Sequence, residues 1–281
     1  MSLLLVKNLS FSYNTGVDVL VDVNFSVESG EHIALVGPNG SGKTTLFLLL
    51  AGFLTPVAGE VLLEDREIRR YPILERARRI AFVPQGGRIE FPYTCLETVL
   101  MGLHPHQSRF ASGESNRFAD DALSLAEDVM RKTGVWNLAG ARVTEISGGQ
   151  MQRLLLARAL LQIFPDTRPH CGPDDLALPR LLLLDETLSE LDIAARIAMM
   201  KILSRLAAER GITVIGVHHD LNLVYRFADR IIALDKGRIA ADGPPDGVFT
   251  QEFFAEVFSV QAEIIHLRGL LFYDNLDTAG T

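Results

Sequence analysis

An octapeptide near the start of the chain, Gly37-Pro-Asn-Gly-Ser-Gly-Lys43-Thr44, has the residue types and spacing of a phosphate-binding loop. Its three glycines let the backbone turn its N–H groups inward around a phosphate chain. Lys43 can reach the β- and γ-phosphates, and the Thr44 hydroxyl can ligate Mg²⁺. The stretch therefore predicts a site for a nucleoside triphosphate.

The flanking sequence supplies the elements that such a loop requires. The apolar residues 33–36 before it are typical of a strand, and the apolar residues 46–51 after it are typical of a helix. A helix that begins near Gly42 would place the positive end of its dipole beneath the same anion. A glycine-rich turn before a core helix is the alternative, but the strand–loop–helix context favours the phosphate site.

Two adjacent carboxylates, Asp185 and Glu186, follow a run of four leucines. Such a run is typical of a strand buried on both faces of a parallel sheet. At the end of this strand Asp185 can hold the Mg²⁺ shell, and Glu186 can polarise the attacking water. A capped strand exit is the alternative, and the phosphate loop elsewhere in the chain favours the catalytic interpretation.

Gln85 and His219 also stand at the ends of expected strands, at 80–84 and 212–217. Ligands of open α/β folds bind at the carboxyl edge of the sheet, which is where His219 would lie. A glutamine there is ordinarily a polar residue at a surface turn, so Gln85 is a candidate site residue only because of the other motifs that follow it in the chain. Tyr13, at another strand end, is either a packing residue or a ring that stacks on adenine.

A second glycine pair, Ser147-Gly-Gly-Gln150, precedes a strongly apolar helix expected over 151–164. Backbone N–H groups at a helix start can bind an anion. Ser147 can equally cap the helix without any ligand.

The order of the elements predicts an α/β protein with a helical insert. Residues 3–36 alternate as strands do, residues 69–79 are expected to form an exposed helix, and strand patterns stop over 91–145. Residues 165–179 form a polar stretch that we interpret as a surface loop. A hairpin is expected to turn at 235–237.

Composition is that of a protein with a substantial core and no affinity for nucleic acid. The 281 residues are 48% hydrophobic, and the net charge is −8 without a block of consecutive basic residues. Cys95 and Cys171 lie far apart without zinc-type spacing, which indicates lone thiols in a reducing compartment. The N-terminus is expected to be a strand rather than a signal peptide, and no apolar run is long enough to span a bilayer.

The ordered set of motifs resembles the ATP-binding subunit of an ABC transporter over nearly the whole length. The motifs, in family order, are Tyr13, the Walker A loop 37–44, Gln85 of the Q-loop, the signature 146–150, Walker B 181–185, Glu186, the D-loop 189–192 and the switch His219. The resemblance implies a P-loop NTPase core with a parallel sheet, an N-terminal antiparallel β-subdomain and a helical signature-motif subdomain. It also implies one ATPase domain over 1–258, with the helical part about 91–160 inserted, and an extension over 259–281.

The resemblance assigns a role to each motif residue. Catalysis is expected from Glu186, His219 and Gln85, and binding of Mg²⁺ from Thr44, Gln85 and Asp185. Binding of ATP is expected from Tyr13, Gly37, Pro38, Asn39, Gly40, Ser41, Gly42, Lys43, Thr44, Thr45, Ser147, Gly148, Gly149, Gln150 and Asp192.

Three positions depart from the family pattern. Thr187 stands where proline usually follows the catalytic glutamate, Glu190 replaces the alanine of the D-loop, and Ile146 opens the signature in place of leucine. None of these removes a group that touches phosphate or metal, so the resemblance implies an active ATPase. Glu190 could alter communication across the dimer.

The same resemblance implies partners. Two copies would pair head to tail, each ATP lying between one Walker A loop and the partner's signature. ATP binding and hydrolysis would close and reopen this homodimer and drive two membrane permease subunits at the cytoplasmic face of the membrane. A periplasmic or lipid-anchored substrate-binding protein would act indirectly.

Residues 91–94, 219–223 and 242–249 look like those of importers of iron–siderophore, haem or cobalamin. Importers of molybdate or tungstate look similar, and an exporter subunit is a further alternative. Soluble ABC ATPases of DNA repair or translation carry insertions that this chain lacks, and a kinase or GTPase would lack the signature. The cargo itself is not encoded in any residue.

Overall fold

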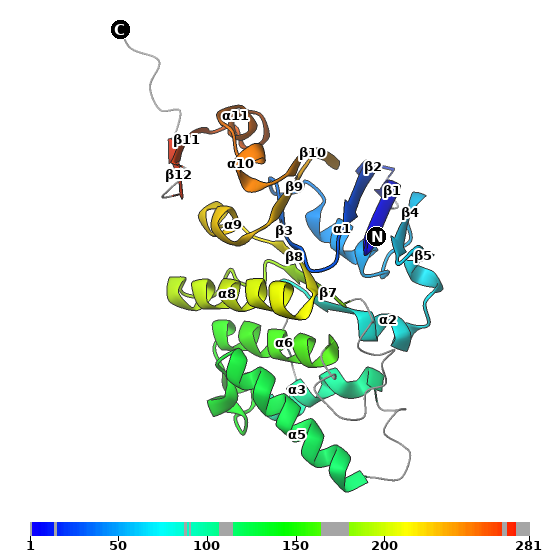
Figure 1. Ribbon diagram of the computed structural model, residues 1–281, viewed down its shortest axis with the longest axis vertical. Coiled ribbons are helices and arrows are strands. Elements are labelled where there is room, and N and C mark those ends of the chain that lie inside the picture. The colour runs from blue at the N-terminus through cyan, green and yellow to red at the C-terminus, as the bar shows by residue number, and fades with distance from the viewer. Residues whose placement is uncertain are drawn as a thin grey trace.

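The computed structural model describes residues 2–13, 16–86, 89, 91–106, 115–163, 180–265 and 269–273. Within these ranges a six-stranded sheet forms the centre of the fold, in the order β10-β9-β3-β8-β7-β6 (Figure 1). Neighbouring strands are parallel from β9 to β6, and β10 is antiparallel to β9. The strands are β3 (His32–Val36), β6 (Ile80–Val83), β7 (Arg180–Asp185), β8 (Ile212–Val217), β9 (Arg230–Asp235) and β10 (Arg238–Gly243).

The leucine run of β7 shows why this sheet is buried on both sides. Leu181 and Leu183 pack on one face, while Leu182 and Leu184 pack on the other, because side chains alternate along a strand. All six residues of β7 are buried. A strand covered on both faces needs an uninterrupted apolar sequence, and this is the pattern that the sequence showed.

An antiparallel sheet and one helix cover the face of Leu181 and Leu183. The sheet has the order β2-β1-β4-β5. These strands are β1 (Leu4–Ser12), β2 (Asp18–Val27), β4 (Ala58–Leu63) and β5 (Arg66–Glu67), and the helix is α1 (Lys43–Leu50). Apolar residues of α1, β1, β2 and β4 share one core with the central sheet.

Helices cover the opposite face, where Leu182 and Leu184 share a core with α3, α5, α6 and α8 (Figure 1). The helices and turns of this part are α2 (Ile73–Arg79), α3 (Cys95–Leu100), η2 (Met101–His106), α5 (Ser115–Lys132), η3 (Trp136–Leu138), η4 (Val143–Glu145), α6 (Gly148–Ile163) and α8 (Ile193–Arg210). The short turn η1 (Ile68–Arg70) belongs to the other face, where Ile68 joins the core of Leu181 and Leu183. The predicted α/β class with its antiparallel and helical parts is therefore confirmed.

A third core lies over β3 and β9, where α9 (Leu221–Phe227), α10 (Pro245–Val248) and α11 (Gln251–Phe258) pack on Ala34, Ile231 and Ala233. A hairpin of β11 (Gln261–Ile265) and β12 (Gly269–Tyr273) follows α11. In the described part of the chain no helix is both long and apolar enough to cross a membrane. The domain boundary proposed near residue 258 stays a prediction.

Two expected elements differ from the observed ones. The helix expected over 69–79 is broken, because Pro72 holds Tyr71 in an extended conformation between η1 and α2. Tyr71 is buried and donates a hydrogen bond to Leu63 O at 2.8 Å, so the break also anchors this segment. Helix α6 begins at Gly148, earlier than the expected residue 151. The predicted loop 165–179 and Cys171 lie outside the described residues.

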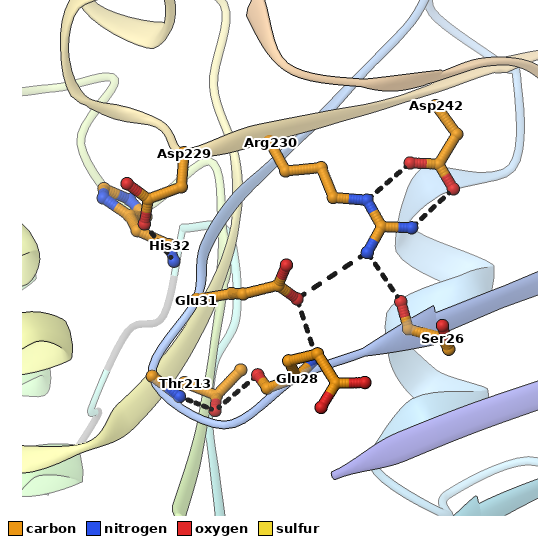
Figure 2. A network of polar contacts seen from close by, with 9 residues as sticks. Ser26, Glu28, Glu31, His32, Thr213, Asp229, Arg230 and Asp242 are labelled. Carbon is orange, nitrogen blue, oxygen red and sulfur yellow. Dashed lines mark hydrogen bonds and ion pairs between the residues drawn. The ribbon is translucent and has the colours of Figure 1, made fainter. Parts of the chain in front are cut away.

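A polar network joins the two sheets at the amino ends of β3 and β9 (Figure 2). The Arg230 guanidinium donates to both Asp242 oxygens at 2.6 and 2.7 Å and to Ser26 O at 2.9 Å, and pairs with Glu31 at 3.7 Å. Because β2 ends and β3 begins here, the network fixes β3 at the end opposite the phosphate loop. Fork-like pairing of this kind holds both position and angle.

Candidate nucleotide and catalytic site

The loop between β3 and α1 has a backbone that only glycine allows at two positions. Gly37 has φ 150° and Gly42 has φ 103°, in the region that side chains disfavour. A Cβ on Gly37 would collide with Leu234 O of β9, and one on Gly42 would lie 2.8 Å from the Leu20 side chain. The glycines therefore let the loop pack closely on β9 and β2 while it turns into α1.

Lys43 closes this loop on itself. Its Nζ donates to Gly37 O at 2.9 Å and to Pro38 O at 2.8 Å, and the residue is only 7% exposed. Burial lowers the pKa of Lys43, while the nearby carboxylates of Glu186 and Asp185 act in the opposite direction. The ammonium is thus held at the mouth of the loop, where it can exchange carbonyl oxygens for phosphate oxygens.

Asp185, the last residue of β7, is almost fully buried. Burial raises the pKa of this carboxyl, and a hydrogen bond with Thr44 and the charge of Lys43 oppose that rise. Its Oδ1 atom and the buried Ser41 hydroxyl find no hydrogen-bond partner among the described residues. Buried polar atoms without partners are uncommon, so both point to a ligand at this loop.

Glu186 brings the remaining predicted catalytic residues together. Its Oε2 accepts a hydrogen bond from Gln85 Nε2 at 2.6 Å, and its Oε1 lies 2.8 Å from His219 Nε2. Gln85 and His219 follow β6 and β8, which pair with β7 on either side. Because parallel strands end at one edge of the sheet, three residues far apart in sequence meet there.

The backbone at Glu186 is strained in a way that aims its side chain. Its φ of 49° lies in the left-handed region, which costs on the order of 1 kcal/mol for a side-chain-bearing residue. The turn is held by Ser189, whose N–H and hydroxyl both donate to Glu186 O, at 3.1 and 2.8 Å. Strain of this kind persists only where surrounding contacts fix it.

Tyr13 lies next to the start of α1. Its hydroxyl is 3.2 Å from the Thr45 hydroxyl, and its ring packs edge-to-face on Phe11 with 4.9 Å between centroids. The residue is 47% exposed, which leaves apolar ring surface open to solvent. The predicted stacking of Tyr13 on adenine stays a prediction.

The signature residues form a second, separate hollow. Ser147 and Gln150 cap α6 reciprocally, since Gln150 N donates to Ser147 Oγ at 3.3 Å and Ser147 N donates to Gln150 Oε1 at 2.8 Å. A hollow of about 410 Å³ is lined by residues 147–150, Arg153, Glu190, Leu191, Asp192 and Ala195. None of loop 37–44 lines it. Asp192 also caps α8, through Ala195 N at 2.7 Å.

Comparison with known proteins identifies the family. A family model described as ABC transporter matches residues 20–164. The hemin import ATP-binding protein HmuV of Rhodopseudomonas palustris (strain BisA53) is 38% identical over 254 residues, which are 90% of this chain and 87% of that protein. The chain belongs to the ABC transporter family. The cobalamin import ATP-binding protein BtuD of Halobacterium salinarum (strain ATCC 29341 / DSM 671 / R1) is 34% identical over 89% of this chain and 57% of that protein.

Solved ABC structures agree with this assignment. A metal-chelate type ABC transporter in an inward-facing conformation matches with a TM-score of 0.74 and 28% identity, over 98% of this chain and 99% of that one. A dimeric ATP-binding cassette bound to ADP and Pi matches with a TM-score of 0.72 and 26% identity, over 86% and 98%. The predicted resemblance to the ATP-binding subunits of haem and cobalamin importers is confirmed, and the chain is a nucleotide-binding ABC ATPase.

The structure accommodates the chain's departures from the ABC pattern. Thr187 is buried and donates a hydrogen bond to Val83 O at 3.3 Å, so it ties the exit of β7 to β6. The Glu190 carboxylate stands against Gly148 at the start of α6, where an added Cβ would collide with it. A phosphate that reached this helix start would meet that negative charge.

Sequence reasoning missed two residues beside this site, Arg196 and Asp220. Arg196 follows the D-loop by four residues and bonds the D-loop carbonyls, and Asp220 follows His219 directly. Their adjacency to named motifs was the available signal, but only the folded chain shows their contacts.

Proposed function

We propose that this chain is the ATP-hydrolysing subunit of an importer that carries a metal chelate (iron–siderophore, haem or cobalamin) across the cytoplasmic membrane. The observation that carries the proposal is the placement of Glu186 between Gln85 and His219, at the edge of the sheet that bears the Walker A loop. This arrangement can orient a water molecule against a terminal phosphate.

The residues at the sheet edge divide the chemistry. Glu186 would accept a proton from the attacking water, His219 and Gln85 would hold its two oxygens in place, and Lys43 would neutralise the phosphate chain. Catalysis then depends mainly on how the water and the phosphates are positioned, because the protein contributes to phosphoryl transfer chiefly by aligning the reacting groups and stabilising charge.

The site also fits Mg²⁺ bound with the nucleotide. The described residues hold no group of three or more His, Cys, Asp or Glu that could bind a metal ion alone. Thr44, Asp185 and Gln85 offer the hydroxyl, carboxylate and amide oxygens that Mg²⁺ prefers, and Asp185 Oδ1 is buried without a partner. Held by these residues, the ion would supply positive charge that offsets the negative charge of the phosphates.

A head-to-tail homodimer would complete each ATP site. The signature hollow is separate from the Walker A loop, and its glycines stand at the start of the sixteen-residue helix α6. Each half can therefore bind only part of a nucleotide, and a second copy would supply the missing part. The dimeric cassette with ADP and Pi supports this arrangement.

The membrane partners follow from the relatives and from exposed apolar residues. Relatives named for hemin and cobalamin import support a complex with a permease. We propose that this complex has two permease subunits, lies at the cytoplasmic face of the membrane and acts with a substrate-binding protein. Phe91, Tyr93 and Met101, at the two ends of α3, are exposed. The rings of Phe91 and Tyr93 lie together, with 6.1 Å between their centroids, and apolar side chains that are contiguous on a surface are typical of a docking site.

Uptake into proteoliposomes tests the proposal. The chain would be reconstituted with the proposed permease subunits, and ATP-driven uptake of haem, an iron–siderophore and cobalamin would be compared, with Glu186→Gln as the inactive control. We expect haem uptake first, because several relatives at 36–40% identity carry the hemin import name. ATP-dependent efflux would overturn the proposed direction of transport, and uptake of molybdate alone would overturn the proposed cargo class.

A further inference from the structure

Arg196 lies on α8, one turn after the D-loop, and its side chain is one quarter exposed. Helix α8 already has a cap at Asp192 and does not need this arginine to begin. The guanidinium turns back over the helix start instead. An arginine fork placed there holds several acceptors in a fixed geometry.

One side of the fork binds the D-loop backbone. Arg196 Nη2 donates to Leu191 O at 3.0 Å and to Ser189 O at 3.2 Å. These carbonyls belong to the turn that Ser189 ties to Glu186 O. The arginine therefore fixes the turn that holds the catalytic glutamate in its strained conformation.

The other side of the fork binds the residue after the switch histidine. Arg196 Nη1 lies 3.3 Å from Asp220 Oδ2. The second oxygen of Asp220 accepts Leu223 N at 3.2 Å and so caps α9. Asp220 is thereby fixed between two elements, and the backbone of His219 immediately before it is restrained.

These contacts close a ring that passes through the catalytic pair. The ring runs from Glu186 to His219, on to Asp220 and Arg196, and back through Ser189 to Glu186. A cavity of about 120 Å³ lies against all five residues. Side chains joined in such a ring are less free to move than two side chains joined only by the 2.8 Å contact between Glu186 and His219.

We propose that Arg196 is a positioning residue that holds the D-loop and the His219 loop as one unit, and so sets the distance between His219 and Glu186. The inference rests on the proposed roles of Glu186 and His219. Without the Arg196 guanidinium, the D-loop turn and Asp220 lose their common partner, so His219 and Glu186 lose their alignment. The contacts of the Walker A loop do not involve Arg196 and are unchanged. The expected result is lower kcat with little change in ATP affinity.

The test compares Arg196→Met with Arg196→Lys and with Arg205→Met, which changes an exposed arginine on the same helix. In the full-length protein with Mg-ATP, we expect Arg196→Met to lower kcat about tenfold with KM within about twofold, since small misplacements of catalytic groups cost this much or more. Arg196→Lys should recover part of kcat, because a point charge can keep the ion pair but not the fork. Arg205→Met should behave as the parent.

Further measurements separate positioning from stability. In the Asp220→Asn background, which keeps an oxygen to cap α9, Arg196→Met should cause little additional loss, because the two residues act as a unit. A lowered melting temperature with kcat unchanged, or full additivity with Asp220→Asn, would overturn the inference. If Glu186→Gln in the same assay hydrolyses ATP at the parental rate, the proposed function fails and this inference with it. Loss in Glu186→Gln but none in Arg196→Met refutes Arg196 alone.

Discussion

Replacing Glu186 with glutamine removes one negative charge from the sheet edge and leaves its shape unchanged. Both contacts of Glu186 can survive, since the amide oxygen can accept from Gln85 Nε2 and the amide nitrogen can donate to a neutral His219 ring. The 16% exposed side chain and the turn closed by Ser189 should keep their places. The variant therefore tests proton acceptance with little change in structure.

The magnitude follows from the role. General base catalysis contributes about 10²- to 10⁴-fold, so kcat should fall by at least about a hundredfold, or about 2.7 kcal/mol in activation free energy. ATP affinity should stay within about threefold, because Lys43 and the loop backbone are unchanged. Phosphate release would measure turnover, equilibrium binding of a fluorescent ATP analogue would measure affinity, and gel filtration with ATP should show a trapped dimer. Hydrolysis at the parental rate would refute the assignment of Glu186 as the base.

Four further predictions concern other parts of the molecule. Lys43→Ala should weaken ATP binding about ten- to a hundredfold, because a charge-assisted contact to phosphate is lost, and unchanged affinity in an equilibrium titration would contradict the role of the loop. Ser147→Arg should leave ATP bound to each Walker A loop but abolish the ATP-dependent dimer, and an unaltered gel-filtration shift would exclude head-to-tail pairing. Burial lowers the pKa of His218 to about 3, so below pH 6.5 the unfolded chain binds a proton that the folded chain does not. The contribution of His218 to the free energy of unfolding is therefore complete above pH 6.5 and falls by about 2 kcal/mol at pH 5. Urea titrations of His218→Asn should show a correspondingly flatter pH dependence. Phe91→Asp should reduce co-purification with the permease at an unchanged melting temperature, whereas Leu100→Asp, which is partly buried against the helical core, should lower the melting temperature.

Local patterns identified most of the elements, because each depends on a few neighbouring residues. The four leucines of β7 indicated a strand buried in a parallel sheet, the apolar residues 33–36 indicated a strand, and both strands are observed. The helix expected over 69–79 is interrupted at Pro72, because a proline disfavours helical backbone at the residue before it, here Tyr71. The start of α6 differed because the Ser147–Gln150 cap admits both glycines into the first turn.

The sequence by itself determined the phosphate loop, the caps and the order of the motifs, because these features depend only on glycine spacing and on apolar runs among residues close in sequence. Only the tertiary structure decided that Gln85, Glu186 and His219 meet, because their approach depends on the order and register of β6, β7 and β8 rather than on any feature near each residue. It likewise decided that Arg196 faces both Ser189 and Asp220. Contacts between side chains distant in sequence depend on how strands and helices pack, and the local sequence pattern around each residue does not specify that packing.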